Sequence, residues 1–275
     1  MKNEKVQKIN PAMFRPFTKS ELRNVPVNWN VNGPDFVGVG TGKAGTSWWY
    51  SLIMQHPQIE ANRLGRKELS YFYHYGYSDI PECDIDTYKQ AFAAPPGSLC
   101  GEWSPGYLNF PFCIEYLAKA APKAKILIIL RNPVDRTISQ LNQLYSVRAK
   151  AFNLEPDMEY ILKVYSFYPE ALCHINYTRS LRQLLRYYDR SQLLILQYEK
   201  CQKDPIKEIS DTYQFLGIDE NFIPADIDKK INKRPYVVPP LNETERKRLA
   251  EYFSDDVFEI VNLFPEIELK LWSDF

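Results

Sequence analysis

The sequence predicts an α/β fold in which helices flank one central parallel sheet. Two apolar runs of strand length, KILIIL at 125–130 and QLLILQ at 192–197, are continuous rather than alternating, which is typical of parallel strands buried on both faces. A third strand, at 36–39, leads through a glycine-rich loop into an apolar helix. The 275 residues contain no hinge-like linker, so we expect an N-terminal arm at 1–34 and one large domain at 35–275.

The loop after the first strand has three features that favour a bound anion. Its glycines allow the backbone to approach a ligand closely. The N–H groups at the start of the next helix are unpaired and lie at the positive end of the helix dipole, and Lys43 adds a full charge. A glycine-rich turn without a ligand is the alternative. We predict a phosphate-binding loop made of Lys43, Ala44, Gly45, Thr46, Ser47 and Trp48.

The order of residues in this loop differs from both common nucleotide-binding loops. A Walker loop places Gly-Lys-Ser/Thr at its end, whereas here Lys43 precedes Gly45. A dinucleotide loop needs the last glycine of G-x-G-x-x-G, and Lys43 stands at that position. The loop therefore belongs to neither type.

A second anion site is predicted after the strand at 125–130. Arg131 stands where this strand gives way to a helix that has Asn132 as its N-cap and Pro133 at its first position, both favoured there. Guanidinium binds phosphate bidentately, and the hydroxyl of Ser139, about two turns into the helix, adds a donor. Pairing of Arg131 with Asp135 is the alternative. Two anion sites at one sheet edge imply a nucleoside with a phosphate group at each end.

The remaining elements follow from local signals. We expect a strand at 99–102 and helices at 87–93, 111–120, 170–188 and 205–216, the last closed by Gly217, since glycine commonly ends helices. Two short helices are expected at the end of the chain. Before them, a basic, proline-rich loop contains residues that could fold over a phosphate or remain solvated: Lys229, Lys230, Lys233 and Arg234.

Composition limits the possible partners and compartments. The chain has 34 basic and 34 acidic residues and a pI near 6.8, which argues against a broad nucleic-acid surface. Five cysteines without a C-x-x-C pair argue against a disulfide framework or a zinc site and fit a reducing cytosol. The first 14 residues lack the apolar core of a signal peptide, and no run has the length of a membrane span, so we expect a cytoplasmic protein with no membrane contact and no metal.

The segment between Lys67 and Lys89 is rich in acids and aromatic residues and has no basic side chain in between. As a wall of a substrate site, it would favour neutral or cationic molecules over polyanions. Carboxyl ends of parallel strands face the ligand, so the end of the strand at 99–102 is expected nearby, although its glutamate could equally cap a loop. The predicted substrate contacts are Tyr71, His74, Glu102 and Trp103.

With these motifs in view, the chain resembles the PAPS-dependent sulfotransferases (PAPS is 3′-phosphoadenosine 5′-phosphosulfate) of the P-loop-like α/β superfamily. The matching segments are GVGTGKAGTSWWYSLIMQHP, KELSYF, GEWSPGYL, ILRNPVDRTISQL and RQLLRYYDRSQLLILQYEKCQKDP leading into FLGI. The chain is most similar to the bacterial and glycan-type branch that contains the heparan sulfate sulfotransferases. The resemblance implies that Lys43, Gly45, Thr46 and Ser47 hold the 5′-phosphosulfate, and that Arg131 and Ser139 hold the 3′-phosphate.

The resemblance also implies a general base, Glu68, with a neighbouring sulfate-binding lysine, Lys67. Two residues depart from the pattern of that branch. Ser70 stands where Lys-Glu-x-His often has its histidine, and Trp103 replaces the lysine of E-K-x-P, which removes a positive charge expected for an anionic glycan. Because other branches use histidine as the base, His74 and His174 are alternative bases.

The predicted function is transfer of the sulfuryl group of PAPS to a hydroxyl or amine of a small neutral or cationic acceptor. Natural-product tailoring, for example of a guanidinium alkaloid, would fit that acceptor. A glycan sulfotransferase, a P-loop kinase and a non-catalytic nucleotide-binding protein are the alternatives.

Overall fold

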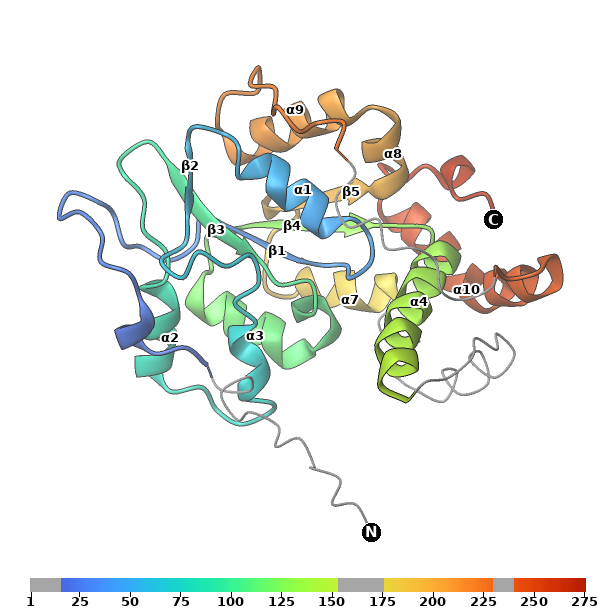
Figure 1. Cartoon of the computed structure of the whole chain (residues 1–275), viewed down its shortest axis with the longest axis horizontal. Helices are drawn as coiled ribbons and strands as arrows, with labels where there is room; N and C mark the ends of the chain where they lie inside the picture. The colour runs from blue at the N-terminus through green and yellow to red at the C-terminus, as the bar shows by residue number, and fades with distance from the viewer. Residues whose placement is uncertain (1–15, 153–175, 230–239) are drawn as a thin grey trace, which may run out of the picture.

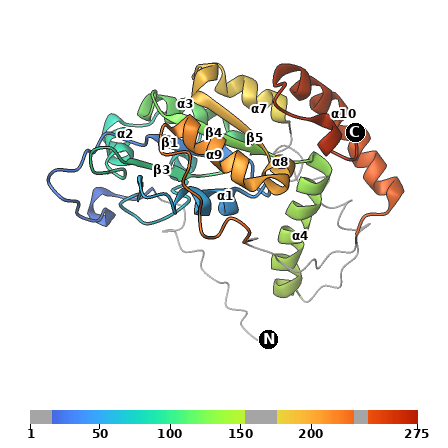
Figure 2. The same cartoon turned by 90° about the horizontal axis from the view of Figure 1, so that it is seen from above.

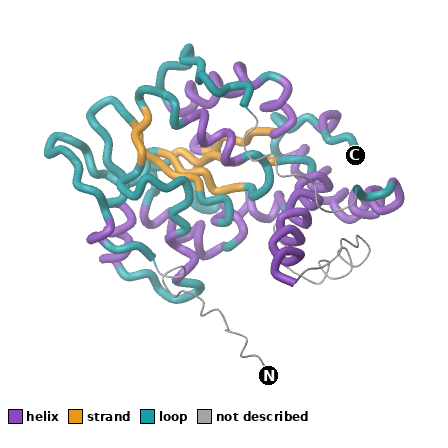
Figure 3. Tube along the Cα trace, in the orientation of Figure 1, coloured by secondary structure: helices purple, strands orange, loops and turns teal. Residues whose placement is uncertain are grey.

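The computed structural model describes residues 16–152, 176–229 and 240–275, with the side chains of 144–152 left out. Five parallel strands form one sheet in the order β2-β3-β1-β4-β5, seen edge to edge at the centre of the molecule in Figure 3. The predicted α/β fold is therefore confirmed. The strands are β1 (Phe36–Gly40), β2 (Ile59–Ala61), β3 (Leu99–Trp103), β4 (Lys125–Leu130) and β5 (Leu193–Gln197).

Helices cover both faces of this sheet (Figures 1 and 2). One face carries α1 (Thr46–Ile53), α8 (Tyr198–Lys203) and α9 (Pro205–Leu216), and the other carries α2 (Glu82–Lys89), α3 (Pro111–Ala120) and α7 (Tyr177–Leu184). The long helix α4 (Pro133–Phe152) stands across the end of the sheet where β1 and β4 finish, and α10 (Glu243–Leu263) packs against α4 and α7. Short 3₁₀ helices lie at Lys19–Glu21, Tyr71–His74, Tyr107–Asn109, Arg190–Gln192 and Leu269–Leu271.

The two faces of β4 explain its continuous apolar sequence. Ile126 and Ile128 belong to the core under α3 and α7, whereas Leu127 and Ile129 belong to the core under α1 and α9. Because successive side chains point to opposite faces, a central strand with two covered faces needs an apolar residue at every position. The close packing extends to β1, where a Cβ at Gly38 would lie 2.0 Å from the Trp103 ring.

Several predicted element bounds are confirmed and others are wrong. Helices at 111–120 and 205–216 have the predicted bounds, and Gly217 closes the second with a φ of 78°. The helix expected at 87–93 is instead Glu82–Lys89, because it begins directly after Pro81 with acids in its first turn. The two short helices expected at the end of the chain are wrong. Instead, α10 starts at an Asn242 capping box and continues for 21 residues, and a 3₁₀ turn at Leu269–Leu271 follows it.

The predicted helix at 170–188 is shorter within the described residues, since α7 begins after the Asn176 cap and ends at Leu184. Residues 16–34 pack on the domain: Phe17 and Leu22 are buried in its core, and Asn30 pairs with Ala94. The division at residue 34 stays a prediction. No helix in the three described ranges has the length and apolar character that a bilayer crossing requires.

Candidate functional site

The loop between β1 and α1 has the backbone geometry of an open anion-binding turn. Lys43 and Gly45 have φ angles of 70° and 87°, in the left-handed region. A Cβ at Gly45 would lie 2.7 Å from the Tyr198 ring, so glycine is required there for space as well as conformation. No side chain caps the start of α1. Its first N–H groups and the positive end of its dipole are therefore directed at the loop.

The predicted second anion site lies directly against this loop. The Arg131 Nη1 donates to the Lys43 carbonyl at 3.1 Å, and the Arg136 Nε donates to the Gly42 carbonyl at 2.9 Å. The Lys43 Nζ in turn donates to the Gln143 Oε1 on α4 at 2.7 Å. The structure thus brings Lys43 and Arg131 to the same sheet edge, as the sequence predicts.

Arg136 carries positive charge that no described carboxylate neutralises, whereas Arg131 interacts with the Glu199 carboxylate. Arg136 is 1% exposed, and its Nη1 has no hydrogen-bond partner; the Arg131 Nε also has none. Burial lowers the pKa of Arg136 and no described carboxylate raises it. Arg131 instead stacks on the Tyr198 ring, 4.9 Å from its centroid. Buried unpaired cations are costly, and an anion in the loop would offset that cost.

The predicted Lys67-Glu68 pair lies at the start of α1. The Lys67 Nζ donates to the Thr46 Oγ1 at 3.1 Å and to the Ser47 Oγ at 3.0 Å, and it pairs with the Glu68 carboxylate at 3.0 Å. The Lys67 side chain is 17% exposed and that of Glu68 is 50% exposed. Burial lowers the pKa of Lys67, and the neighbouring carboxylate partly offsets this. The Lys67 ammonium group therefore links the loop at 43–48 to the Glu68 carboxylate.

A small cavity of about 140 Å³ opens beside the loop. Its walls include the aromatic rings of Trp48 and Tyr198, which meet edge to face with centroids 6.4 Å apart. The Trp48 Nε1 is buried and has no hydrogen-bond partner. A flat aromatic ligand could stack in this cavity. The full lining is Gly45, Trp48, Tyr198, Gln202, Pro205, Ile227 and Asp228.

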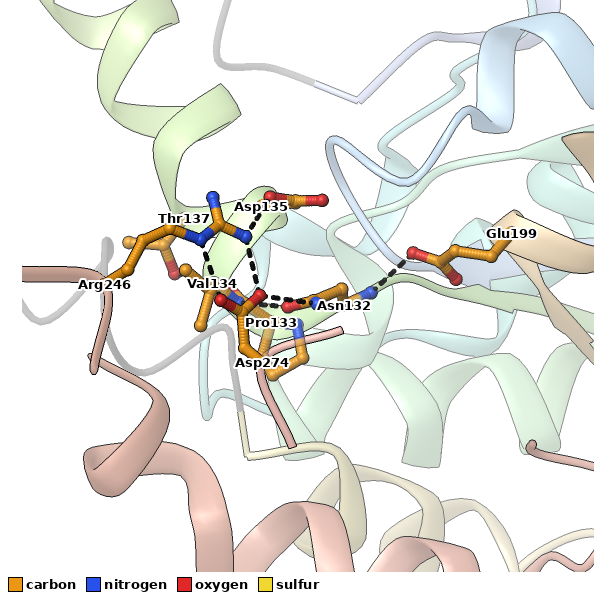
Figure 4. Close-up of polar contacts among 8 residues, drawn as sticks. All are labelled: Asn132, Pro133, Val134, Asp135, Thr137, Glu199, Arg246 and Asp274. Atoms are coloured by element: carbon orange, nitrogen blue, oxygen red, sulfur yellow. Dashed lines mark hydrogen bonds and ion pairs between the residues drawn. The ribbon is translucent and has the colours of Figure 1, made fainter. Parts of the chain in front are cut away.

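The turn that follows Arg131 is fixed by the C-terminal tail (Figure 4). The Asn132 N–H donates to Glu199 at 2.9 Å and its side-chain amide to Asp274 at 2.8 Å. Arg246 bridges Asp274, at 2.6 and 2.7 Å, and Asp135, at 2.8 Å. Asp135 therefore pairs with Arg246, and the alternative pairing with the strand-end arginine is wrong.

Three predicted substrate contacts are buried: the pleat of β3 turns Glu102 and Trp103 to opposite faces of the sheet, and Tyr71 packs into the core from the 3₁₀ helix Tyr71–His74. Trp103 is fully buried, and its Nε1 donates to the Gly40 carbonyl at 3.2 Å. Glu102 is also fully buried, and Tyr71 is 1% exposed with its hydroxyl on the Asp84 carbonyl. None of these side chains is accessible to an acceptor. The prediction that they contact the acceptor directly is therefore wrong.

The structure describes some of the remaining predicted site residues and not others. Ala44 is buried in the loop, and Ser139 is partly exposed on α4. His74 is partly exposed, and burial lowers its pKa. The predictions for Lys230, Lys233, Arg234 and His174 concern positions outside the described residues. In the described part of the chain, no group of three acidic, histidine or cysteine residues could hold a metal ion.

Sequence reasoning missed Arg136 and Gln143 as parts of the site. Both lie on α4, where positions 136, 139 and 143 share one face, because residues separated by three, four or seven positions align on a helix. The prediction for Ser139, combined with this spacing, could therefore have indicated that Arg136 and Gln143 belong to the site. Tyr198, which faces Gly45 and Arg131, had no comparable signal.

Comparison with known proteins agrees with this geometry. The family model described as sulfotransferase domain matches residues 33–236. The membrane-associated sulfotransferase kil1 of Dictyostelium discoideum is 32% identical over 127 residues, or 46% of this chain and 26% of that protein. The bifunctional heparan sulfate N-deacetylase/N-sulfotransferase 4 of Mus musculus is 24% identical over 284 residues, or 87% of this chain and 31% of that protein. The chain thus spans about a quarter to a third of these relatives.

Solved structures share the fold. A crystal structure of a sulfotransferase from Alicyclobacillus acidocaldarius has a TM-score of 0.67 at 23% identity and covers 87% of this chain and 98% of that one. The mouse sulfotransferase SULT7A1, complexed with PAP, has a TM-score of 0.50 at 16% identity, covering 82% and 85% of the two chains. Since the family model covers most of the sequence, including the loop at 43–48 and the turn at Arg131, this chain belongs to the sulfotransferase domain family.

Proposed function

We propose that this chain transfers the sulfuryl group of PAPS to a hydroxyl or amine acceptor. The observation that carries the proposal is the set of contacts made by the Lys67 ammonium group. It bonds Thr46 and Ser47 in the phosphate loop and pairs with Glu68. An anion in the loop and an acceptor at this carboxylate would therefore meet at one cation.

The donor would occupy three neighbouring features. Its 5′-phosphosulfate would accept hydrogen bonds from the loop at 43–47 and from the Lys43 ammonium group. The adenine would stack in the cavity beside the loop, where the rings of Trp48 and Tyr198 form one side of the lining. Its 3′-phosphate would be bound by Arg131 and Ser139, which both have partly exposed side chains. Lys233 and Arg234 remain predicted contacts.

The proposed reaction is an in-line displacement at sulfur. The acceptor oxygen or nitrogen forms a bond to sulfur, the bond from sulfur to the 5′-phosphate oxygen breaks, and PAP leaves with that electron pair. Glu68 takes the acceptor's proton, which is typically worth roughly 10²–10⁴ in rate. Lys67 and Lys43 stabilise charge on the sulfuryl and bridging oxygens, and a preorganised donor of this kind typically contributes about 3 kcal/mol.

The acceptor class has two candidates. A small neutral or cationic acceptor is favoured by exposed acids along 79–86, because these repel polyanions. An anionic glycan is favoured by a groove of about 860 Å³ lined by Arg179 and Arg182 on α7 and by Arg186 in the turn after it. This groove includes Leu108, which packs on Gly40 at the end of β1. Among the described residues, Arg182 pairs with a carboxylate, Glu259, and the other two arginines do not.

An acceptor panel with sulfur-labelled PAPS tests the proposal. We expect labelled product from at least one of agmatine, p-nitrophenol and N-desulfated heparin, with agmatine supporting the cationic class and heparin the glycan class. Lys43→Ala should abolish turnover and weaken PAP binding. The matched control Lys119→Ala removes a lysine that pairs with Glu115 on the surface of α3 and should change neither. Full turnover in Lys43→Ala would contradict the donor assignment.

Glu68→Gln separates the base from the donor site. Turnover should fall at least 10²-fold, while PAP affinity stays within a factor of about three. Unchanged turnover would refute Glu68 as the base and direct attention to His74. Magnesium-dependent ATP hydrolysis by the wild-type chain would favour a kinase instead.

A further inference from the structure

The backbone on both sides of Glu68 is fixed by one buried network that ends on Glu102. The Lys67 carbonyl accepts from the Trp103 N–H at 2.9 Å, a bond that continues the edge of β3. Two residues later, the Leu69 N–H donates to the Glu102 Oε2 at 2.9 Å. Glu68 itself keeps a half-exposed side chain. The backbone of Glu68 is therefore held through its two neighbours, and its carboxylate pairs with the Lys67 ammonium group.

The next two backbone amides are connected to the same carboxylate through the hydroxyl groups of Ser104 and Tyr107. The Ser70 N–H donates to the Ser104 Oγ at 2.9 Å, and this hydroxyl donates to the Glu102 Oε2 at 2.6 Å. The Tyr71 N–H donates to the Tyr107 hydroxyl at 2.8 Å, which donates to the Glu102 Oε1 at 3.1 Å. Ser70 has a φ of 50°, an uncommon conformation outside glycine. Its relay helps to hold the chain in that conformation.

A fourth donor completes the coordination of the Glu102 carboxylate. The Tyr88 hydroxyl donates to the Glu102 Oε1 at 2.8 Å. Unlike the Tyr107 hydroxyl, it accepts no hydrogen bond from the amides of 69–71. A carboxylate accepts at about four lone-pair sites, so all of its capacity is used. Burial raises the pKa of Glu102, and the four donors offset this. A glutamine would present an NH₂ group to at least one pair of these donors, so it would break one side of the network.

We propose that Glu102 is a positioning residue for the reaction, acting through the backbone of 69–71 to hold Glu68 and Lys67 against the phosphate loop. This inference rests on the proposed role of Glu68 as the base. Misplacement of a catalytic group by about 1 Å can cost 10²-fold in rate. A buried network that fixes three successive amides beside Glu68 is therefore expected to control kcat.

Two tyrosines give a matched pair of variants for the test. Tyr107→Phe and Tyr88→Phe each remove one hydroxyl donor from the Glu102 Oε1 and keep the aromatic ring, but only Tyr107→Phe also frees the Tyr71 amide. Amide hydrogen exchange of 69–71, PAP affinity, and kcat with the best acceptor of the panel are measured for both. Glu102→Gln is measured with them, alone and combined with Glu68→Gln.

We expect exchange at the 69–71 amides to be about tenfold faster in Glu102→Gln and Tyr107→Phe, with kcat reduced about 10- to 100-fold in Glu102→Gln and PAP affinity nearly unchanged. Tyr88→Phe should keep wild-type exchange at 69–71 and wild-type kcat. In the Glu68→Gln background, Glu102→Gln should lower kcat little further, since the effects of residues that act as a unit are not additive.

Three results would overturn the inference: equal effects of the two tyrosine variants, unchanged kcat in Glu102→Gln, or full additivity of Glu102→Gln with Glu68→Gln. If Glu68→Gln alone leaves turnover unchanged, the base assignment fails instead. The two failures are thus distinguishable.

Discussion

Arg136 gives the sharpest physical test of the donor site, because its charge is buried and no carboxylate of the described residues pairs with it. We consider Arg136→Met, which keeps a long apolar side chain in the same space. The substitution removes one hydrogen bond from a charged donor to the Gly42 carbonyl, worth about 1.5–3 kcal/mol. It also removes an unpaired buried charge, which costs several kcal/mol. The free protein should therefore be as stable as the wild type or more stable.

The bound state should respond in the opposite direction. A unit charge roughly 8 Å from a phosphate contributes about 2 kcal/mol at an effective dielectric constant of about 20. Loss of Arg136 should then weaken PAP binding about 30-fold. Thermal unfolding with and without PAP measures both effects. For a chain of this size, 1 kcal/mol corresponds to roughly 2–4 °C in Tm.

Arg190→Met is the matched control, since it removes the same charge from a half-exposed arginine that pairs with Glu266. It should leave the PAP-induced rise in Tm unchanged. A lower Tm for free Arg136→Met, together with a wild-type rise on adding PAP, would show that Arg136 is a structural residue and would refute the reasoning.

Three further predictions follow from individual contacts. Lys67→Met should lower kcat about 10²-fold with less than a tenfold change in PAP affinity, and unchanged kcat would exclude Lys67 from the reaction. Asp274→Asn breaks the Arg246 bridge to the C-terminal tail; since Arg246 is about a third exposed, calorimetry should show a loss of only about 1 kcal/mol. Burial raises the pKa of Tyr71 and Tyr177 to about 12. Both tyrosines ionise earlier in the unfolded chain, so the stability they contribute is fully present below pH 10 and is lost from pH 10 to 12; denaturant titration should show stability falling across that range. Constant stability across that range would contradict the burial of these hydroxyls.

The sequence predicts the sheet, the turn around Lys43 and the position of Arg131 at a strand end well, because each has a local cause. Continuous apolar runs give β4 and β5, and the glycines around Lys43 mark a turn whose φ angles are positive at positions 43 and 45. Arg131 follows from its position after a strand. These features depend on neighbours in the chain and can be read from it.

The contacts that complete the site depend on residues far apart in sequence. Glu102 and Trp103 are adjacent and polar or aromatic at a strand end, which suggested substrate contact, yet the pleat sends one into each core. The partner of Asp135 is Arg246, 111 residues away. Such pairings follow from the packing of α10 on α4, which no local pattern indicates. The length of α10 was missed although its buried residues Ala250, Phe253, Val257 and Ile260 recur at helical spacing, so this pattern could have predicted one long helix.

A crystal structure of this chain with PAP tests the central claim most directly. We expect the 5′-phosphate to accept hydrogen bonds from the backbone of 44–47 and from the Lys43 Nζ, with the 3′-phosphate of the same molecule bound by Arg131 and Ser139. PAP bound elsewhere, or with only one of its phosphate groups in contact with these residues, would contradict the claim.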